Sequence, residues 1–336
     1  MKHFKGNLVY LSKEELAELK SYTFPVYGTF EMAEAFCSKA NMLINLRTLT
    51  LLGSRWRHNK YGRLFISKIS VLSTLEFFDC SFCGLRKLDS LCHLKNLKIL
   101  NCCGNKLKAL PSDLCLQNLE EFYCSNCDLK ELPSLCHLKN LKILNCCRNY
   151  DLTFLPFDLG FLQALEELNC YHCDLQELPS LCYLKNLKIL DCSLNHLKSF
   201  PVNLGLLQSL ERIDCWGCDF QGLPSSLCEL KNLKILDCRF NGLKSLPSDI
   251  GLLQNLKEFD CSHNQLSSLP FSLGNLSNLK RFYCHNNNLS SLPFSICHLS
   301  PNLNIRYSDN PLLPEIPQDC WTNLLIYLKE KAVEEF

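Results

Sequence analysis

The sequence predicts a solenoid of the α/β class, in which short strands stack as successive copies of one unit. One well-formed copy, residues 233–247, reads L-K-I-L-D-C-R-F-N-G-L-K-S-L-P. On a strand, Leu236 and Cys238 share one face and their polar neighbours point to the other, so the strand is half-buried. A unit of this kind recurs every 22–24 residues, which is a solenoid period. One unit buries little apolar surface by itself, so the copies must stack to make a core.

Each copy is numbered here from its first leucine, which makes Leu233 position one. Position six is a cysteine from Cys80 onward, until Tyr307 takes its place. An asparagine at position nine suits the bend after the strand, because its amide can satisfy backbone groups that leave the ladder. A worn earlier copy, with Ser54 at position nine, brings the expected number of strands to about twelve. The later position-nine residues are Cys83, Asn105, Cys127, Asn149, Cys173, Asn195, Cys218, Asn241, Asn264, Asn287 and Asn310.

The pattern LxxLxCxxNxLxxLPxxLxxLxN resembles the leucine-rich repeat. Its length of 22–23 residues and its Leu-Pro pair are similar to the intracellular class, found in Ras-pathway scaffolds, plant intracellular repeat proteins and some effectors of intracellular bacteria. The resemblance covers residues 43–317. It implies a curved leucine-rich repeat solenoid with a parallel sheet on its concave side, short turns on its convex side and protein binding as its usual role.

Non-repeat segments flank the array, and we expect both to be helical caps that cover its open ends. In residues 1–42, Ser12 and Glu15 form a capping box that predicts a short helix through about Lys20, and residues 30–40 predict another. Residues 318–336 have the apolar spacing of a closing helix. The alternatives are an adaptor-recruiting motif at the first end and a partner-binding helix at the second. The array itself contains an irregular insert, residues 53–71.

Composition narrows the classes of function. The net charge of +1 and pI near 7.4 give no global field that favours nucleic acid or an anionic membrane. No run approaches the roughly 18 apolar residues of a membrane span, and the first twenty residues lack the apolar core of a signal peptide. Most of the 24 cysteines occupy fixed repeat positions, which favours thiols in a reducing compartment. We therefore expect a cytoplasmic monomer, although N-x-S triplets at Asn275 and Asn288 point weakly the other way.

Two kinds of chemistry are weighed and set aside. C-x-x-C pairs begin at Cys80, Cys124, Cys170 and Cys215 and suggest zinc or a redox couple when taken out of context. In the repeat frame they are positions six and nine, both inward, and successive pairs lie two strands or about 10 Å apart, too far to share one ion. We predict structural thiols, with no metal and no cofactor. A hydrolytic set of Asp260, Ser262, His263 and His285 lacks every nucleophile motif, so we predict no enzyme.

The candidate site is the concave face, where positions three, five, seven and eight should project. Asp or Asn is the usual residue at position five and Ser is the commonest at position seven, and the large or charged departures gather in the second half. An aromatic side chain on an open sheet face gains no core burial, which suggests that a partner covers it. The alternative is that the rings pack on one another and that the aspartates are family background. The predicted partner-binding residues are Tyr171, His172, Asp214, Trp216, Asp237, Arg239, Phe240, Asp260, His263, Tyr283 and His285.

The sequence therefore predicts a non-enzymatic scaffold or adaptor that captures a protein partner on its concave face. A second hypothesis is a secreted effector of an intracellular bacterium, which would bind a host protein in the host cytosol. A third, of another class, is nucleic-acid or phosphoinositide binding through the insert, where basic residues alternate with aromatic ones. Those basic residues are Arg55, Arg57, Lys60, Arg63 and Lys68.

Overall fold

The structure is a computed structural model that describes residues 3–25, 30–51, 68–88, 91–112 and 114–311. It divides into two compact units, residues 1–174 (unit 1) and residues 175–336 (unit 2). The boundary follows Asp174, which is position ten of the copy that begins with Leu165. The expected C-terminal cap, residues 318–336, and the basic residues 55–67 of the insert lie outside the described residues.

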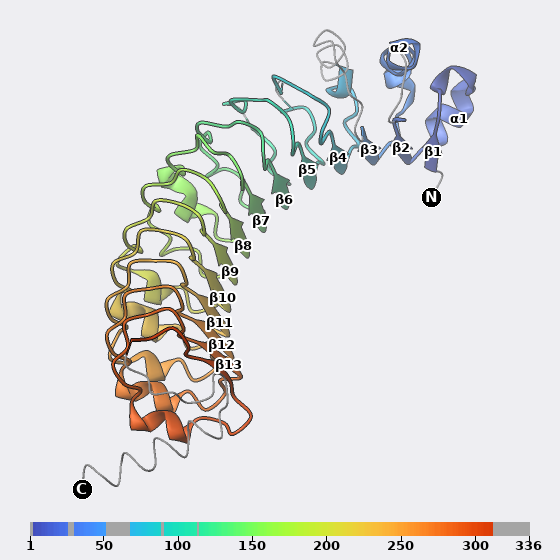
Figure 1. The fold of residues 1–336 in the computed structure, drawn as a ribbon. Coiled ribbons are helices and arrows are strands. Elements are labelled where there is room, and N and C mark those ends of the chain that lie inside the picture. Colours follow the sequence, from blue (N-terminus) through green and yellow to red (C-terminus); the bar gives the residue numbers. More distant parts are fainter. Residues whose placement is uncertain (1–2, 26–29, 52–67, 89–90, 113, 312–336) are drawn as a thin grey trace, which may run out of the picture. The chain divides into compact units, whose positions relative to one another are not determined.

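Unit 1 contains eight parallel strands that pair in chain order (Figure 1). Each repeat strand has three residues, of which the middle one is buried in the core and the outer two are half-buried. This is the alternation that the repeat pattern predicts. The strands are β1 (His3–Lys5), β2 (Ser21–Thr23), β3 (Thr48–Thr50), β4 (Phe77–Asp79), β5 (Ile99–Asn101), β6 (Glu121–Tyr123), β7 (Ile143–Asn145) and β8 (Glu167–Asn169).

The N-terminal segment has the two predicted helices, α1 (Lys13–Glu18) and α2 (Phe30–Lys39). The capping box is confirmed, because the Ser12 hydroxyl accepts from the Glu15 N–H and the Glu15 carboxylate accepts from the Ser12 N–H. The same segment also supplies β1 and β2, so the described residues hold two strands more than the twelve expected. The sequence missed both because they lie outside the repeat pattern. Tyr22 of β2 is buried, and its ring stacks on Phe36 of α2 at 5.9 Å.

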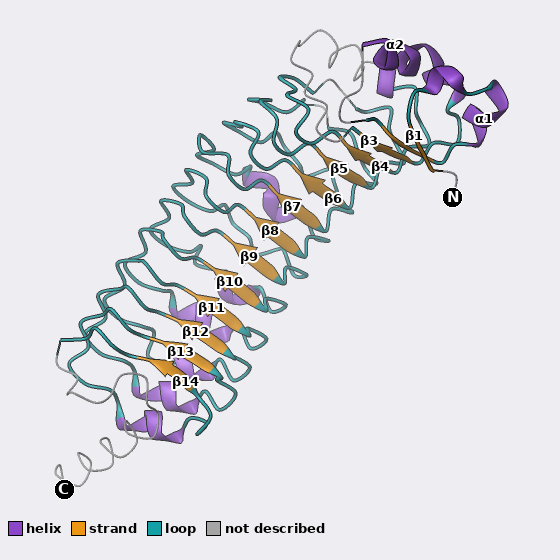
Figure 2. Cartoon of the chain, turned by 45° about the vertical axis from the view of Figure 1, so that its right-hand side comes forward, coloured by secondary structure: helices purple, strands orange, loops and turns teal. Residues whose placement is uncertain are grey.

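Unit 2 contains six parallel strands, again paired in chain order, with short 3-10 helices on the other side of the leucine core (Figures 1 and 2). The strands are β9 (Ile189–Asp191), β10 (Arg212–Asp214), β11 (Ile235–Asp237), β12 (Glu258–Asp260), β13 (Arg281–Tyr283) and β14 (Asn304–Arg306). The 3-10 helices are Leu204–Leu206, Ser225–Glu229, Ile250–Leu252, Phe271–Asn275 and Phe294–His298, and unit 1 has one such turn between repeats at Phe157–Phe161.

Neighbouring 3-10 turns of unit 2 approach one another closely at two glycines. A Cβ added to Gly251 would lie 2.0 Å from the Ser272 carbonyl oxygen, and one added to Gly274 would lie 2.1 Å from that of Ser295. No side chain fits in this space, since real contacts of a Cβ with oxygen exceed 3 Å. The glycines therefore allow these repeats to stack at their turns.

The bend after each repeat strand has one conformation throughout both units. Position eight is left-handed in each of the eleven copies from Phe82 to Asp309, with φ between 50° and 66°. Two of these residues are glycine, Gly104 and Gly217, and the other nine adopt a conformation that costs about 1 kcal/mol for a residue with a Cβ. The sequence predicted a bend here, but the variety of residues at position eight concealed its conformation.

Candidate functional site

The C-x-x-C cysteines are buried in the repeat core, and those at position nine bond to the backbone. Asn105, at position nine, donates from Nδ2 to the carbonyl oxygens of Cys80 (3.0 Å) and Cys102 (2.7 Å), and its Oδ1 accepts from the Leu85 N–H. In the next copy the thiol of Cys127 makes the equivalent bond to the preceding position-six carbonyl, that of Cys102, at 3.0 Å. A cysteine at position nine thus takes over one bond of the asparagine amide.

Burial keeps the position-six thiols protonated. It raises the pKa of Cys80, Cys124 and Cys215 well above the ordinary value for a thiol, so none of them is a ready metal ligand or nucleophile. Across the described ranges, no group of three or more His, Cys, Asp or Glu side chains could hold a metal ion.

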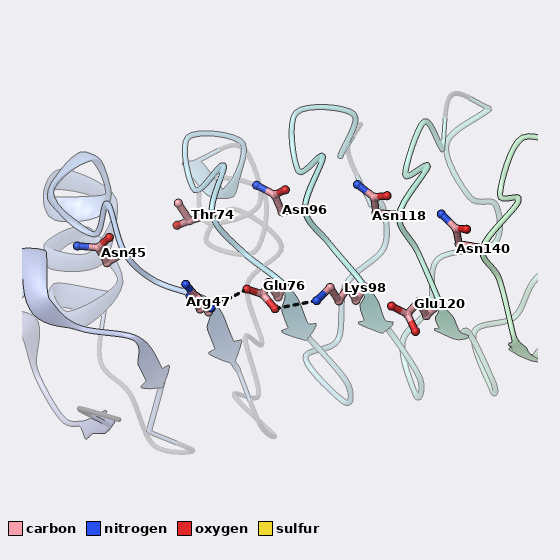
Figure 3. Close-up of a pocket in the computed structure, with 9 residues that line it drawn as sticks. All are labelled: Asn45, Arg47, Thr74, Glu76, Asn96, Lys98, Asn118, Glu120 and Asn140. Carbon is pink, nitrogen blue, oxygen red and sulfur yellow. Dashed lines mark hydrogen bonds and ion pairs between the residues drawn. The ribbon is translucent and has the colours of Figure 1, made fainter.

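A groove of about 350 Å³ runs along the N-terminal ends of the strands of unit 1 (Figure 3). Its rim is a row of asparagines whose amides donate to backbone carbonyls of the preceding repeat, as Asn96 does to Ser73 and Asn118 does to Lys95. Its floor carries the charges of position two, which alternate in sign and form cross-strand ion pairs, as Glu76 does with Arg47 and Lys98. The lining residues are Asn45, Arg47, Thr74, Glu76, Asn96, Lys98, Asn118, Glu120 and Asn140.

The bonds that line the groove recur elsewhere in the chain. In unit 2, Asn232, Asn255 and Asn278 make the same amide-to-carbonyl bond. Lys234 also pairs with Glu211 at 2.7 Å, as Lys142 does with Glu120 at 2.6 Å in unit 1. Because these groups are already bound within the chain, the groove offers no distinctive chemistry to a ligand.

The open sheet face of unit 2 brings together nine of the predicted site residues. Just after β10 and β11, the guanidinium carbon of Arg239 lies 5.2 Å from the centroid of the Trp216 ring, a cation–π arrangement. The same guanidinium lies between two carboxylates, 3.5 Å from Asp237 Oδ2 and 3.7 Å from Asp260 Oδ2. These are ion-pair distances without close hydrogen bonds, and Nε of Arg239 is buried without a hydrogen-bond acceptor.

A chain of ring contacts continues along the same face from β11 toward β14. Phe240 stacks on His263, with ring centroids 4.0 Å apart and planes inclined by 10°. His263 meets His285 edge-on at 5.1 Å, and His285 lies beside Tyr283 at 6.4 Å. Phe240 nevertheless remains 50% exposed. The rings therefore pack on one another, as the alternative interpretation expected, and they still leave aromatic surface open.

The packing of the rings fixes the protonation state of His285 and the contacts of His263. Burial lowers the pKa of His285, so its ring is neutral near pH 7. The Ser262 hydroxyl is buried and donates to Asp260 Oδ1 at 2.5 Å, while the His263 ring is stacked on Phe240. The hydrolytic set considered above therefore has its serine hydroxyl engaged by the carboxylate and its histidine used for stacking.

The position-five aspartates occupy consecutive strands, in register from Asp191 through Asp214 and Asp237 to Asp260. Asp214 differs from the expectation of an open surface group. It is buried, and both its oxygens accept from the guanidinium of Arg212, at 2.5 and 3.0 Å. It therefore holds Arg212 in place. Burial raises the pKa of Asp237 to about 6 and raises that of Asp191 as well.

The remaining two predicted residues, Tyr171 and His172, belong to unit 1. The ring of His172 lies 4.8 Å from that of Tyr150, and Arg148 lies over Tyr171 at 5.9 Å. Both are half-buried. In unit 1 they form a second group of ring contacts, with Tyr150 and Arg148 as partners.

Sequence reasoning missed two arginines that complete the unit 2 face. Arg212, at position three, was not singled out, and its role follows from its bond to Asp214. Arg306 lies over the Tyr283 ring at 5.4 Å and takes position five of the last copy. A comparison of position five through that copy would have found it, because the other copies from Asp79 onward have Asp, Asn or Tyr there.

Comparisons with known proteins agree with this geometry. The model for leucine-rich repeats in two copies matches residues 117–157 and 254–297. A leucine-rich-repeat protein of Leptospira interrogans is 27% identical with a TM-score of 0.72, and the match covers 97% of this chain and 74% of that one. An internalin (inlF) of Listeria monocytogenes is 20% identical with a TM-score of 0.69, covering 90% of this chain and 84% of that one. No curated protein sequence matches.

A plant peptide hormone receptor, RGFR1 in complex with RGF2, has the same fold at 22% identity and a TM-score of 0.62; the match covers 92% of this chain and 54% of the receptor. The chain is a repeat solenoid with an open sheet face. Its strands are parallel and three residues long, its leucines point inward, and the side chain at position nine bonds to the backbone. The chain is a leucine-rich-repeat protein. Among the residues that the structure describes, no helix is long and apolar enough to cross a membrane.

Proposed function

We propose that this protein is a non-enzymatic scaffold that captures a protein partner on the open sheet face of unit 2. The partner-binding surface, called the unit 2 face below, consists of Asp214, Trp216, Asp237, Arg239, Phe240, Asp260, His263, Tyr283 and His285. Tyr171 and His172 of unit 1 are proposed as an accessory contact.

The observation that carries the proposal is Phe240. Its ring is half exposed on a sheet face, and its backbone is left-handed with φ of 53°, a conformation that glycine would adopt at less cost. The fold gains neither core burial nor a relaxed backbone from this residue. A large exposed ring beside Trp216 and Arg239 is the composition of a binding hot spot. Leucine-rich-repeat proteins commonly bind proteins, and the plant receptor of this fold is described in complex with RGF2.

The test uses the double variant Trp216→Ala with Phe240→Ala in affinity capture, alongside thermal melts followed by circular dichroism. We expect capture to be lost and the melt to be nearly unchanged, since neither ring fills the core. Phe271→Ala is the matched control, because Phe271 is 68% exposed but lies on a 3-10 turn. Undiminished capture by the double variant would exclude the unit 2 face.

The proposal also covers the cellular compartment in which the protein acts. Each cysteine of the described residues is a free thiol, and most are buried at fixed positions. This supports a reducing compartment, hence the cytoplasm, or the host cytosol if the protein is a translocated effector. A translocation reporter fused to the chain separates these two cases, and an unexported reporter excludes the effector hypothesis.

A further inference from the structure

In several copies the side chain at position five accepts a hydrogen bond from the backbone of position seven, and this bond does not require a negative charge. In unit 1, Oδ1 of Asn101 accepts from the Cys103 N–H at 3.1 Å, and Asn145 and Asn169 make the same bond to position seven. In unit 2, Oδ1 of Asp191 and of Asp260 accepts the same N–H, at 3.1 and 2.9 Å. An amide oxygen does this work as well as a carboxylate. The charge in unit 2 therefore has another cause.

The position-five row of unit 2 also changes sign along the sheet. Four aspartates on β9–β12 are followed by Tyr283 on β13 and Arg306 on β14, all in register. Lys280, at position two of the β13 copy, adds an exposed positive charge near this end. On the same strands, Glu211 pairs with Lys234 and Glu258 pairs with Arg281. The row thus runs from four carboxylates to one guanidinium.

Two of these aspartates, Asp237 and Asp260, share one arginine. Arg212 is committed to Asp214, and Arg239 lies 3.5 and 3.7 Å from the other two carboxylates. Among the described residues, these two arginines therefore serve three aspartates, Asp214, Asp237 and Asp260. Adjacent like charges that are partly buried cost folding free energy, which asparagines at the same positions would avoid. A cationic partner would supply the missing charge on binding.

We propose that the unit 2 face binds an extended polypeptide segment with segregated charges, its Lys or Arg side chains over β9–β12 and an Asp or Glu beside Arg306. The inference rests on the proposed function and specifies the partner for that same surface. Five steps between strands of about 4.8 Å span about 24 Å, which an extended chain covers in seven or eight residues at about 3.3 Å each. Its apolar side chains would contact Trp216 and Phe240, which follow β10 and β11 beside the aspartates of those strands.

The experiment selects phage-displayed random dodecapeptides on the full chain. Selected peptides are then synthesised and their binding measured by fluorescence anisotropy at low and high salt. For each, we also make a peptide of the same composition with its charges alternating, and one with glutamine in place of lysine and arginine. The protein variants are the triple change Asp191→Asn, Asp237→Asn, Asp260→Asn, and the control Asp79→Asn. Asp79 makes the same bond, to Ser81 N–H at 2.8 Å, on β4 of unit 1.

We expect selected peptides with a basic block and an acidic end, bound at least tenfold more tightly than their alternating counterparts. The triple variant should lose at least tenfold in affinity, whereas Asp79→Asn should stay within twofold. If the triple variant were misfolded, the glutamine peptides would give the same answer with the native protein, because their loss of affinity reports the same charges.

The inference is overturned if no peptide is selected, if the selected peptides lack a basic block, or if charge order has no effect. Peptides that need Trp216 and Phe240 but not the aspartates would leave the proposed surface intact and remove this choice of partner. Peptides whose affinity changes neither with the aspartate variants nor with the Trp216 and Phe240 variants would rule out both this inference and the proposed binding surface.

Discussion

The groove of unit 1 and the unit 2 face are both lined by polar and charged residues from successive strands, yet their groups are bound in different ways. In the groove, Asn96 and Asn118 donate to the backbone, and Glu120 pairs with Lys142 at 2.6 Å. On the unit 2 face, Arg239 reaches its carboxylates at 3.5 Å or more and Phe240 is half exposed. Residues that recur in each copy thus bond closely to the neighbouring copy, whereas Arg239, a departure from the repeat, reaches its carboxylates only at ion-pair distances.

The largest effect should come from a recurring residue. Nδ2 of Asn264 donates to the carbonyl oxygens of Cys238, Cys261 and Ser262, and its Oδ1 accepts from the Leu243 N–H. Asn264→Ala leaves buried backbone groups without partners, so we expect the free energy of unfolding to fall by about 3 kcal/mol. Urea denaturation followed by circular dichroism measures this.

Asn255→Ala is the control for Asn264→Ala, because Asn255 is exposed and gives one bond, to the Lys231 carbonyl oxygen at 2.8 Å. Its loss should be small, since water can replace the amide. Asn264→Cys should fall between the two, because a thiol restores one bond at position nine, as Cys127 shows. If Asn264→Ala and Asn255→Ala lowered the free energy of unfolding equally, the buried asparagine of position nine would matter no more than an exposed one.

The next effect concerns the aspartates, which should cost stability in the free protein. The pKa of Asp237 is raised to about 6 by burial, aided by Asp260 and Asp214 and opposed by Arg239. The folded protein thus holds this proton more tightly than the unfolded chain, whose pKa is near 3.8. The stability that protonated Asp237 contributes is complete below about pH 4 and is lost as the pH rises through 6.

Asp237→Asn removes this titration and keeps the acceptor for the Arg239 N–H. We expect the variant to be more stable than the native protein by about 1 kcal/mol at pH 7.5, a figure discounted for partial exposure. The difference should vanish near pH 4, as measured by melts across pH. For Asp79→Asn the gain should be smaller, because its register neighbours, Thr50 and Asn101, carry no charge. A gain independent of pH would show that burial of charge is not the cause.

A smaller effect should separate the ring of Phe240 from its backbone. Phe240→Ala and Phe240→Gly both remove the stacking on His263, but only glycine adopts φ of 53° without strain. We therefore expect the glycine variant to be more stable than the alanine variant by about 1 kcal/mol, with partner capture lost in both. Urea melts of the two proteins give the difference. Equal stability would mean that the bend relaxes when the ring is removed.

The repeat pattern was sufficient to predict the fold, because it repeats the same physical requirements in each copy. The inward faces of Leu236 and Cys238, the bound amide at position nine and the capping box at Ser12 all follow from local spacing. What repeats could not reveal was β1 and β2, which lie in residues without the pattern. The left-handed bend was equally hidden, since Phe240 and Leu194 are residues that rarely adopt it.

The candidate site was predicted in composition but not in its pairings. Departures from the repeat correctly marked Trp216, Phe240 and His263 as neighbours on one face. The repeat positions could not predict that Asp214 is buried and accepts two hydrogen bonds from the Arg212 guanidinium. That contact depends on how the long arginine side chain folds back along its own strand. The partner-binding role of the unit 2 face remains a prediction.

The smallest effect should come from the charged floor of the unit 1 groove. The bond from Lys142 lowers the pKa of Glu120, yet both side chains are well exposed, so solvent and salt screen the pair. Glu120→Gln should leave the thermal melt almost unchanged, and 1 M salt should erase any remaining difference from the native protein. Partner capture by this variant should equal that of the native chain. A loss of capture would instead make the groove a binding surface and reverse the contrast drawn between the two regions.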